Sequence, residues 1–182
     1  LNKYVDKIIT DENKVKNLNH GNTLEGSVTQ ELKLENEFIT SSGFQKFLCD
    51  SVFTWIKLSE NKEIKSFSLL SSWIVRQFKN EYNPVHYHSG HVSGVGYLKV
   101  PDNFGENPQN KKNNHNGKID LIYGTRQFLS ESSFVITPEV GFFYFFPHYL
   151  MHTVFPFNGT DEERRSVSFN ARIDEETFNV YG

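Results

Sequence analysis

The sequence contains very little cysteine, and this limits the kinds of fold it can form. Cys49 is the single cysteine among 182 residues, so no disulfide can form within the chain. Disulfide frameworks support small secreted domains, whereas unpaired cysteines are normal in reducing compartments. We therefore expect a fold stabilised by its hydrophobic core, and a cytoplasmic location.

Long hydrophobic runs and a dominant charge are also missing. The longest aromatic run, residues 142–146, is far shorter than the ~20 apolar residues of a membrane-spanning helix. The start, Leu1–Tyr4, has no apolar signal-peptide core and no initiator methionine, as expected of a trimmed or partial chain. With 19 basic and 22 acidic residues, the net charge is -3, which argues against a membrane or nucleic-acid partner.

Aromatic residues are abundant, and they favour strands over helices. They make up 15% of the chain, with 17 Phe. Short β-like runs separated by turn residues follow Glu60, which predicts a β-sandwich or barrel. The runs cover residues 67–78, 92–100, 118–123, 133–136, 142–146, 153–155 and 164–173. Between two of them, residues 102–117 are rich in Asn, Lys and Gly, which predicts a long surface loop that serves as a lid.

One helix is clearly predicted before the strands. It runs from about Ser42 to Leu58, with Ser42 as N-cap and Gln45 completing a capping box. Its apolar face is expected to pack against a sheet, and it comprises Phe44, Phe47, Leu48, Val52, Trp55 and Ile56. Residues 1–182 are thus expected to form one domain, with a helical or irregular flank over 1–60 and a β core over 65–175.

Histidines supply a candidate metal site. His86 and His88 stand two apart, so both imidazoles point to one side of an extended strand, and His152 can arrive from a distant strand. A nearby histidine pair and a distant third ligand leave open metal positions, as in non-heme iron oxygenases. His91 and His148 are expected to flank the site or substitute for a ligand. His20 and His115, in polar turns, are not expected to bind metal.

The segment 164–173 alternates strictly, as a half-buried strand does. Arg164, Ser166, Ser168, Asn170 and Arg172 share one face, and the intervening residues share an apolar face. Arg164, assisted by Ser166, is the candidate to bind a carboxylate bidentately, while Arg165 turns away. The competing interpretation is a solvent-exposed strand face on which the two arginines are ordinary surface residues.

Taken in order, several segments resemble the 2-oxoglutarate/Fe(II)-dependent oxygenase family found in bacteria and marine phages. The resemblance covers about residues 65–175 and is carried by residues 83–88, 93–101, 138–147, 152–154 and 164–170. It implies a mainly β fold with flanking helices, the cupin-like double-stranded β-helix or jelly roll. By position it implies metal ligands at His88 and His152 with His86 as the third, and 2-oxoglutarate binding by Arg164, Ser166 and Tyr97.

The function implied by this resemblance is an iron- and 2-oxoglutarate-dependent oxygenase, a hydroxylase whose substrate is a small molecule or a protein side chain. Fe(II) and 2-oxoglutarate are the expected cofactors and molecular oxygen the co-substrate, in a bacterial cytoplasm or an infected host cell. His86-x-His88 departs from the wider superfamily, where the second position is Asp or Glu. Two alternatives stay open, a cupin-like metal enzyme that does not use 2-oxoglutarate and a non-catalytic jelly-roll module. Substrate and oligomeric state are not readable from the sequence.

Overall fold

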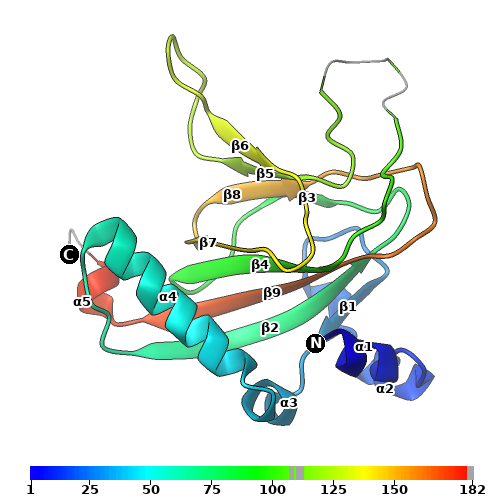
Figure 1. The fold of residues 1–182 in the computed structure, drawn as a ribbon, viewed down its shortest axis with the longest axis horizontal. Helices are drawn as coiled ribbons and strands as arrows, with labels where there is room; N and C mark the ends of the chain where they lie inside the picture. Colours follow the sequence, from blue (N-terminus) through cyan, green and yellow to red (C-terminus); the bar gives the residue numbers. More distant parts are fainter. Residues whose placement is uncertain (107–108, 110–112, 180–182) are drawn as a thin grey trace.

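The computed structural model describes residues 1–106, 109 and 113–179, and its fold is built on two antiparallel sheets (Figure 1). The helices are α1 (Asn2–Ile8), α2 (Glu12–Leu18), η1 (Gly21–Thr23), α3 (Asn36–Ser41), α4 (Phe44–Glu60) and α5 (Glu175–Phe178). The strands are β1 (Gln30–Lys33), β2 (Phe67–Gln77), β3 (Asn83–His86), β4 (Val92–Lys99), β5 (Ile119–Ile122), β6 (Ser133–Ile136), β7 (Phe143–Pro147), β8 (Met151–Val154) and β9 (Arg164–Ile173). Within the described residues, every helix is too short or too polar to cross a bilayer.

The two sheets face each other as the layers of a jelly roll. The major sheet has the order β1-β2-β9-β4-β7 and the minor sheet the order β3-β8-β5-β6 (Figure 1). A small core lies between them and includes Val95, Tyr97, Ile119, Ile136 and Phe146. Apart from the β5–β6 hairpin, neighbouring strands in both sheets are far apart in the sequence, as in a double-stranded β-helix. The predicted fold class, mainly β with flanking helices, is confirmed.

The helices cover the outer face of the major sheet. Buried residues of α4, namely Phe44, Leu48, Val52 and Ile56, pack in the same core as Val167, Phe169 and Ala171 of β9. Of the predicted apolar face, Phe47 is 41% exposed and lies at the edge, where its ring meets Phe143 at 4.9 Å. The apolar stripe of this helix therefore holds it flat on the sheet, and the sheet's opposite face is left to build a pocket.

The predicted capping box at the start of this helix is wrong. The N-cap of α4 is Gly43, in the left-handed region with φ 77°, and the Ser42 hydroxyl, one residue earlier, accepts from the Phe44 N–H at 3.3 Å. Ser42 instead closes α3, where its backbone N–H donates to Phe38. Glycine tolerates this left-handed conformation at no steric cost, so the chain turns sharply between the two helices.

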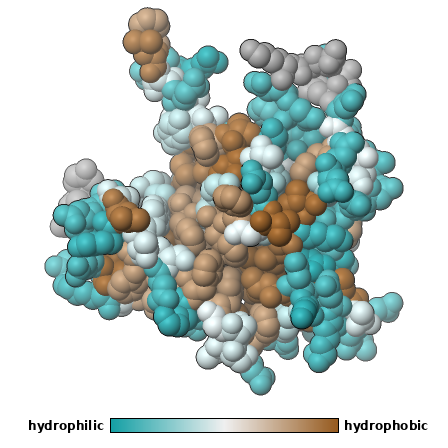
Figure 2. Space-filling model, in the orientation of Figure 1, coloured by the Kyte–Doolittle hydropathy of each residue, from teal (hydrophilic) through white to brown (hydrophobic). Residues whose placement is uncertain are grey.

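Most of the predicted strands occur at the expected places. The structure also has two further strands, β1 and β3, which were not among the predicted runs. Each has four residues. Part of the predicted lid loop, residues 107–108 and 110–112, lies outside the described residues, so the lid stays a prediction. The hairpin between β5 and β6 projects from the molecule, and apolar atoms gather at its tip (Figures 1 and 2). Phe128 and Leu129, in the turn closed by the bridge between Gln127 and Ser130, are exposed.

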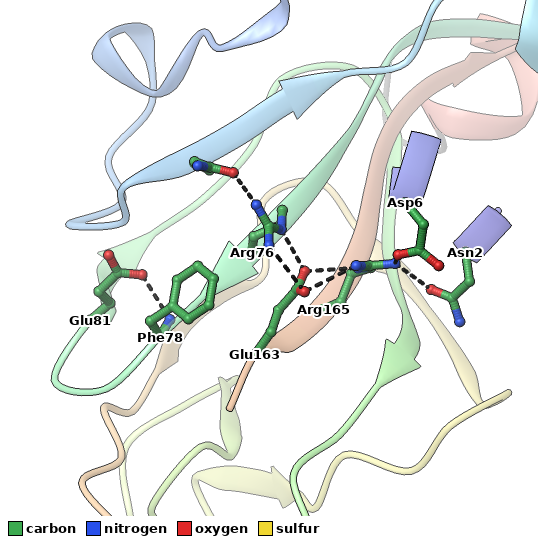
Figure 3. Close-up of polar contacts among 8 residues, drawn as sticks. Asn2, Asp6, Arg76, Phe78, Glu81, Glu163 and Arg165 are labelled. Atoms are coloured by element: carbon green, nitrogen blue, oxygen red, sulfur yellow. Dashed lines mark hydrogen bonds and ion pairs between the residues drawn. The ribbon is translucent and has the colours of Figure 1, made fainter. Parts of the chain in front are cut away.

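A buried ionic network ties the first helix to the major sheet (Figure 3). The Glu163 carboxylate accepts hydrogen bonds from Arg76, at 2.6 and 3.2 Å, and from Arg165, at 2.8 and 3.0 Å. Arg165 also pairs with Asp6 of α1 at 2.8 Å. Burial alone would raise the pKa of Glu163, but hydrogen bonds from Arg165 and Arg76 outweigh it and hold the pKa at about 2.

We expect Glu163→Gln to destabilise the protein by about 3 kcal/mol at neutral pH, because it leaves two buried guanidinium groups without their shared anion. The folded-state pKa lies below the ordinary value of 4.5, so this stabilisation is present above about pH 4.5 and is lost as the pH falls toward 2. Urea unfolding at pH 7 and pH 3 measures both effects. Glu162→Gln, at an exposed neighbouring carboxylate, is the control. An equal loss of stability at both pH values would contradict the proposed linkage.

Candidate metal centre and co-substrate pocket

The facing surfaces of the two sheets enclose a pocket of about 430 Å³. Alternation along β9 directs Arg164, Ser166, Ser168 and Asn170 into this pocket, as predicted. From the minor sheet and its connections come His86, His88 and His152. The pocket therefore holds a cationic side chain from one sheet and a histidine group from the other.

Three histidines converge in the pocket. One ring nitrogen from each of His86, His88 and His152 lies within 4.8 Å of the others. His86 and His152 are opposite each other in the pairing of β3 with β8, which brings together residues 66 positions apart. His88 follows β3, and its backbone N–H donates to the carbonyl of His148. Strand pairing thus positions two of the three imidazoles, and a backbone hydrogen bond positions the third.

Each imidazole is oriented by a hydrogen bond through its Nδ1. The acceptors are the Pro84 carbonyl for His86 at 2.7 Å, the Leu150 carbonyl for His152 at 2.9 Å, and Asn170 Oδ1 for His88 at 2.8 Å. A carbonyl oxygen only accepts, so Nδ1 carries the ring proton and Nε2 keeps its lone pair. Hydrogen bonds of this kind orient histidine ligands in metal sites.

The geometry of these nitrogens fits a metal ion. His88 Nε2 and His152 Nε2 lie 3.0 Å apart, and two unprotonated nitrogens at that distance repel unless a cation lies between them. A metal ion with metal–nitrogen bonds of about 2.1 Å could bind both of these nitrogens at this separation. The donor set is therefore suited to a divalent ion that keeps open positions for other ligands.

Two of these histidines, His88 and His152, are neutral under ordinary conditions. Burial, then the neighbouring His152 and His86, lowers the pKa of His88 to about 3. Burial and then His86 lower the pKa of His152 to about 4. Neutral imidazoles are the form that binds metal, so little proton release is needed for these two rings to act as ligands.

Arg164 lies on β9 and is almost completely buried, with 1% of its surface exposed. Its Nε donates to the Gly117 carbonyl at 2.9 Å, and its guanidinium stacks over the Tyr97 ring at 5.1 Å. Among the described residues it forms no ion pair. Burial lowers the pKa of this guanidinium from its ordinary value, as expected for a desolvated charge without a carboxylate partner. A small dicarboxylate would supply that partner.

Ser166 and Tyr97 are next to this arginine, opposite each other in the pairing of β4 with β9. Ser166 lines the pocket. Tyr97 is fully buried, and the Arg164 guanidinium lies over its ring. Burial raises the pKa of Tyr97, so its hydroxyl stays protonated and can donate. Ser166 is therefore placed to contact an anion held by Arg164, whereas Tyr97 does not line the pocket and contacts Arg164 itself.

The remaining histidines lie outside the converging group. The His91 ring is hydrogen-bonded to the Ile173 carbonyl and stacks on the Phe178 ring, with centroids 4.0 Å apart. The His148 ring is hydrogen-bonded to the His88 carbonyl. His115 packs on Phe155. His20 lines the pocket, which the sequence did not predict. Asn170, Trp73 and Glu31 were also missed, and only Asn170 had a signal, its place on the polar face of β9.

A jelly roll with converging histidines and a buried arginine in one pocket defines a class of protein, the non-heme iron oxygenases that use 2-oxoglutarate. The chain belongs to the family described as "Putative 2OG-Fe(II) oxygenase", whose model matches residues 71–170, more than half of its length. Membership confirms the predicted family and, with it, the predicted enzyme class and its cofactors, Fe(II) and 2-oxoglutarate.

Solved structures agree with the fold. A 2OG-Fe(II) oxygenase family oxidoreductase from Burkholderia pseudomallei is 14% identical, with TM-score 0.50 and coverage of 72% of this chain and 57% of that one. A Pseudomonas putida prolyl-4-hydroxylase is 15% identical, with TM-score 0.50 and coverage of 82% and 79%. A viral collagen prolyl hydroxylase from Paramecium bursaria Chlorella virus-1, in a 2OG complex, is 15% identical, with TM-score 0.55 and coverage of 81% and 80%.

The sequence identities to these solved structures are low. At such identities the likeness shows the fold alone, and the chain spans just over half the length of the Burkholderia oxidoreductase. No curated protein sequence matches the chain. The roles of individual residues therefore depend on the geometry of this pocket.

Proposed function

We propose that this protein hydroxylates its substrate at an Fe(II) ion held by His86, His88 and His152, with 2-oxoglutarate bound by Arg164. The observation that supports this most directly is the buried guanidinium of Arg164, which forms no ion pair among the described residues, in the same pocket as three converging imidazoles. Neither alternative function requires both features. A cupin-like enzyme without 2-oxoglutarate has no use for Arg164, and a binding module has no use for the histidines.

Each side chain has a separate task in this proposal. Arg164 holds the C5 carboxylate of 2-oxoglutarate, Ser166 adds a hydrogen bond to the same group, and Tyr97 contacts Arg164 itself. Asn170 keeps the His88 ring oriented by accepting from Nδ1, and Ser93 donates to the same Asn170 oxygen at 2.9 Å. Bound Fe(II) supplies the oxygen chemistry, in which oxidative decarboxylation of 2-oxoglutarate is coupled to hydroxylation. Apolar walls at Val95, Ile119 and Phe146 exclude water from the pocket.

The proposal treats residues 1–182 as one oxygenase domain, because His20 and Glu31 of the N-terminal flank line the same pocket as the β-core residues. Two structural neighbours are prolyl hydroxylases, but at 15% identity they do not identify a substrate here. A small molecule and a protein side chain both stay open as substrates. The cytoplasmic location stays a prediction from the single cysteine.

Anaerobic titration tests the proposal. We expect Fe(II) to bind first, and 2-oxoglutarate to produce the weak visible metal-to-ligand charge-transfer absorption of the chelate. Succinate, which lacks the 2-oxo group, is the control and is expected to give no absorption band. Iron binding without a band would favour a cupin-like enzyme, and absence of iron binding would favour a non-catalytic module.

A further inference from the structure

The N-terminal flank contributes one wall of the pocket that the proposed function does not use. Glu31 and Lys33 of β1 face the pocket, and η1 and its neighbours add His20, Thr23, Leu24 and Glu25. In the pairing of β1 with β2, Glu31 is opposite Val75. In the pairing of β2 with β9, Val75 is opposite Ser166. Glu31 is therefore two strand spacings, about 10 Å, from Ser166 across the sheet. This wall is close enough to bind a substrate that reaches the metal.

Glu31 is a buried carboxylic acid with an unused oxygen. Its exposed fraction is 1%, and Oε2 has no hydrogen-bond partner among the described residues. Gly21 and Gly26 lie directly over the carboxyl group, since a Cβ on either would come within 3.3 Å of one of its oxygens. Asn83 hydrogen-bonds to this carboxyl group, which leaves Oε2 as the buried oxygen that lacks a counterpart.

Two residues of the same pocket, Asn83 and His20, also carry a free hydrogen-bond acceptor. Asn83 Oδ1 and His20 Nε2 are both buried and lack partners among the described residues. Burial, and then Lys33, lowers the pKa of His20, so its ring is neutral and can accept. Lys33 is exposed and forms no ion pair with Glu31 in the described part of the chain. A ligand that satisfied Glu31 Oε2, Asn83 Oδ1 and His20 Nε2 would bring hydrogen-bond donors.

We infer that Glu31, together with Asn83 and His20, binds a cationic nitrogen group of the substrate, a primary ammonium or a guanidinium. The inference rests on the proposed function, because it places this group beside the oxygenase pocket. Burial raises the pKa of Glu31 to about 7, with Glu81 adding to the rise and Asn83 opposing it. A cation beside the carboxyl group lowers this pKa again and favours the charged pair.

Trp73 connects this subsite to the metal centre. Its ring stacks on the His88 ring, with ring centroids 5.7 Å apart. It also makes a T-shaped contact with the His20 ring, with centroids 6.0 Å apart. A substrate held by Glu31 must therefore pass along the indole to reach the histidine group. Indole faces also attract cations, which adds to the preference for a positively charged nitrogen. The expected substrate is elongated, with its basic group several bonds away from the carbon that is hydroxylated.

Fluorescence of Trp73 offers a direct binding assay. The chain has two tryptophans, so Trp55→Phe leaves Trp73 as the only indole. We would titrate this protein, loaded anaerobically with Fe(II) and 2-oxoglutarate, with n-butylammonium and n-butylguanidinium, and with 1-butanol and butyrate as neutral and anionic controls. We expect saturable emission changes with the two cations only. Glu31→Gln should weaken their binding by about ten-fold or more, and Glu37→Gln, at an exposed carboxylate of α3, should not.

The outcomes separate a ligand-binding role of Glu31 from a structural one. Glu31→Asp keeps the charge and is expected to retain part of the cation binding, which tests the inference even where Glu31→Gln folds poorly. Binding of butyrate as tightly as butylammonium, or equal cation affinity in Glu31→Gln and the parent, would overturn the inference. The charge-transfer band is recorded in each sample beforehand. Loss of that band indicates failure of the proposed function, whereas an intact band without cation binding indicates failure of this inference alone.

Discussion

Replacing His152 with alanine is expected to lower the affinity for Fe(II) by more than about 100-fold and to abolish 2-oxoglutarate turnover. Loss of a residue that only orients a metal ligand costs 10- to 100-fold, and loss of a ligand should cost more. His152 is 4% exposed, and its Nε2 lies 3.0 Å from that of His88. Anaerobic calorimetry with Fe(II) measures the affinity, and oxygen consumption measures turnover.

The matched control is His115→Ala. His115 packs on Phe155 and does not belong to the converging group, so its removal should leave both readouts within experimental error. Thermal unfolding shows whether either variant has lost its fold. Parental iron affinity in a folded His152→Ala variant would mean that the distant ligand is a different residue.

Arg164→Ala is expected to raise the dissociation constant for 2-oxoglutarate by about 100-fold, or about 3 kcal/mol, with little change in Fe(II) affinity. The guanidinium is buried and has no ion pair among the described residues, so the C5 carboxylate would be its charged partner. Arg164→Lys keeps the charge but loses the bidentate geometry, and an intermediate affinity is expected. The charge-transfer band, titrated with 2-oxoglutarate, reports each constant.

Arg172→Ala controls for charge on the same strand. Arg172 belongs to the same face of β9 but is exposed, so its loss should not alter 2-oxoglutarate binding. Unchanged turnover in Arg164→Ala would point instead to the cupin-like alternative, in which the reaction does not need this arginine.

The direction of a side chain in the pocket could be predicted from the sequence where the alternation of a strand determines it. A strand alternates with a period of two, so Arg164 and Arg165 had to face opposite ways, and they do. Arg164 faces the pocket, whereas Arg165 pairs with Glu163 and Asp6 on the other side. The approach of His152 to His86 depended on long-range pairing, and there the family resemblance supplied the missing information.

Features created only by tertiary contact could not be predicted. The strand β1 reads Gln-Glu-Leu-Lys, with no β-branched or aromatic residue, and its pairing with β2 is what makes it a strand. For the same reason Glu31 looked like an ordinary surface residue, although it is 1% exposed. At Ser42 the local capping signal was present, but the turn between α3 and α4 used Gly43 instead.

The opposed arginines of β9 also restrict how this chain can change length during evolution. An insertion or deletion of one residue inside the strand would exchange the two faces, sending Arg165 into the pocket and Arg164 under the helices. Both the anion site and the network of Glu163 would be lost in one event. Residues 155–162, between β8 and Glu163, carry no such constraint of parity. Natural length variants among related sequences should therefore cluster in that connection and be absent from residues 164–170.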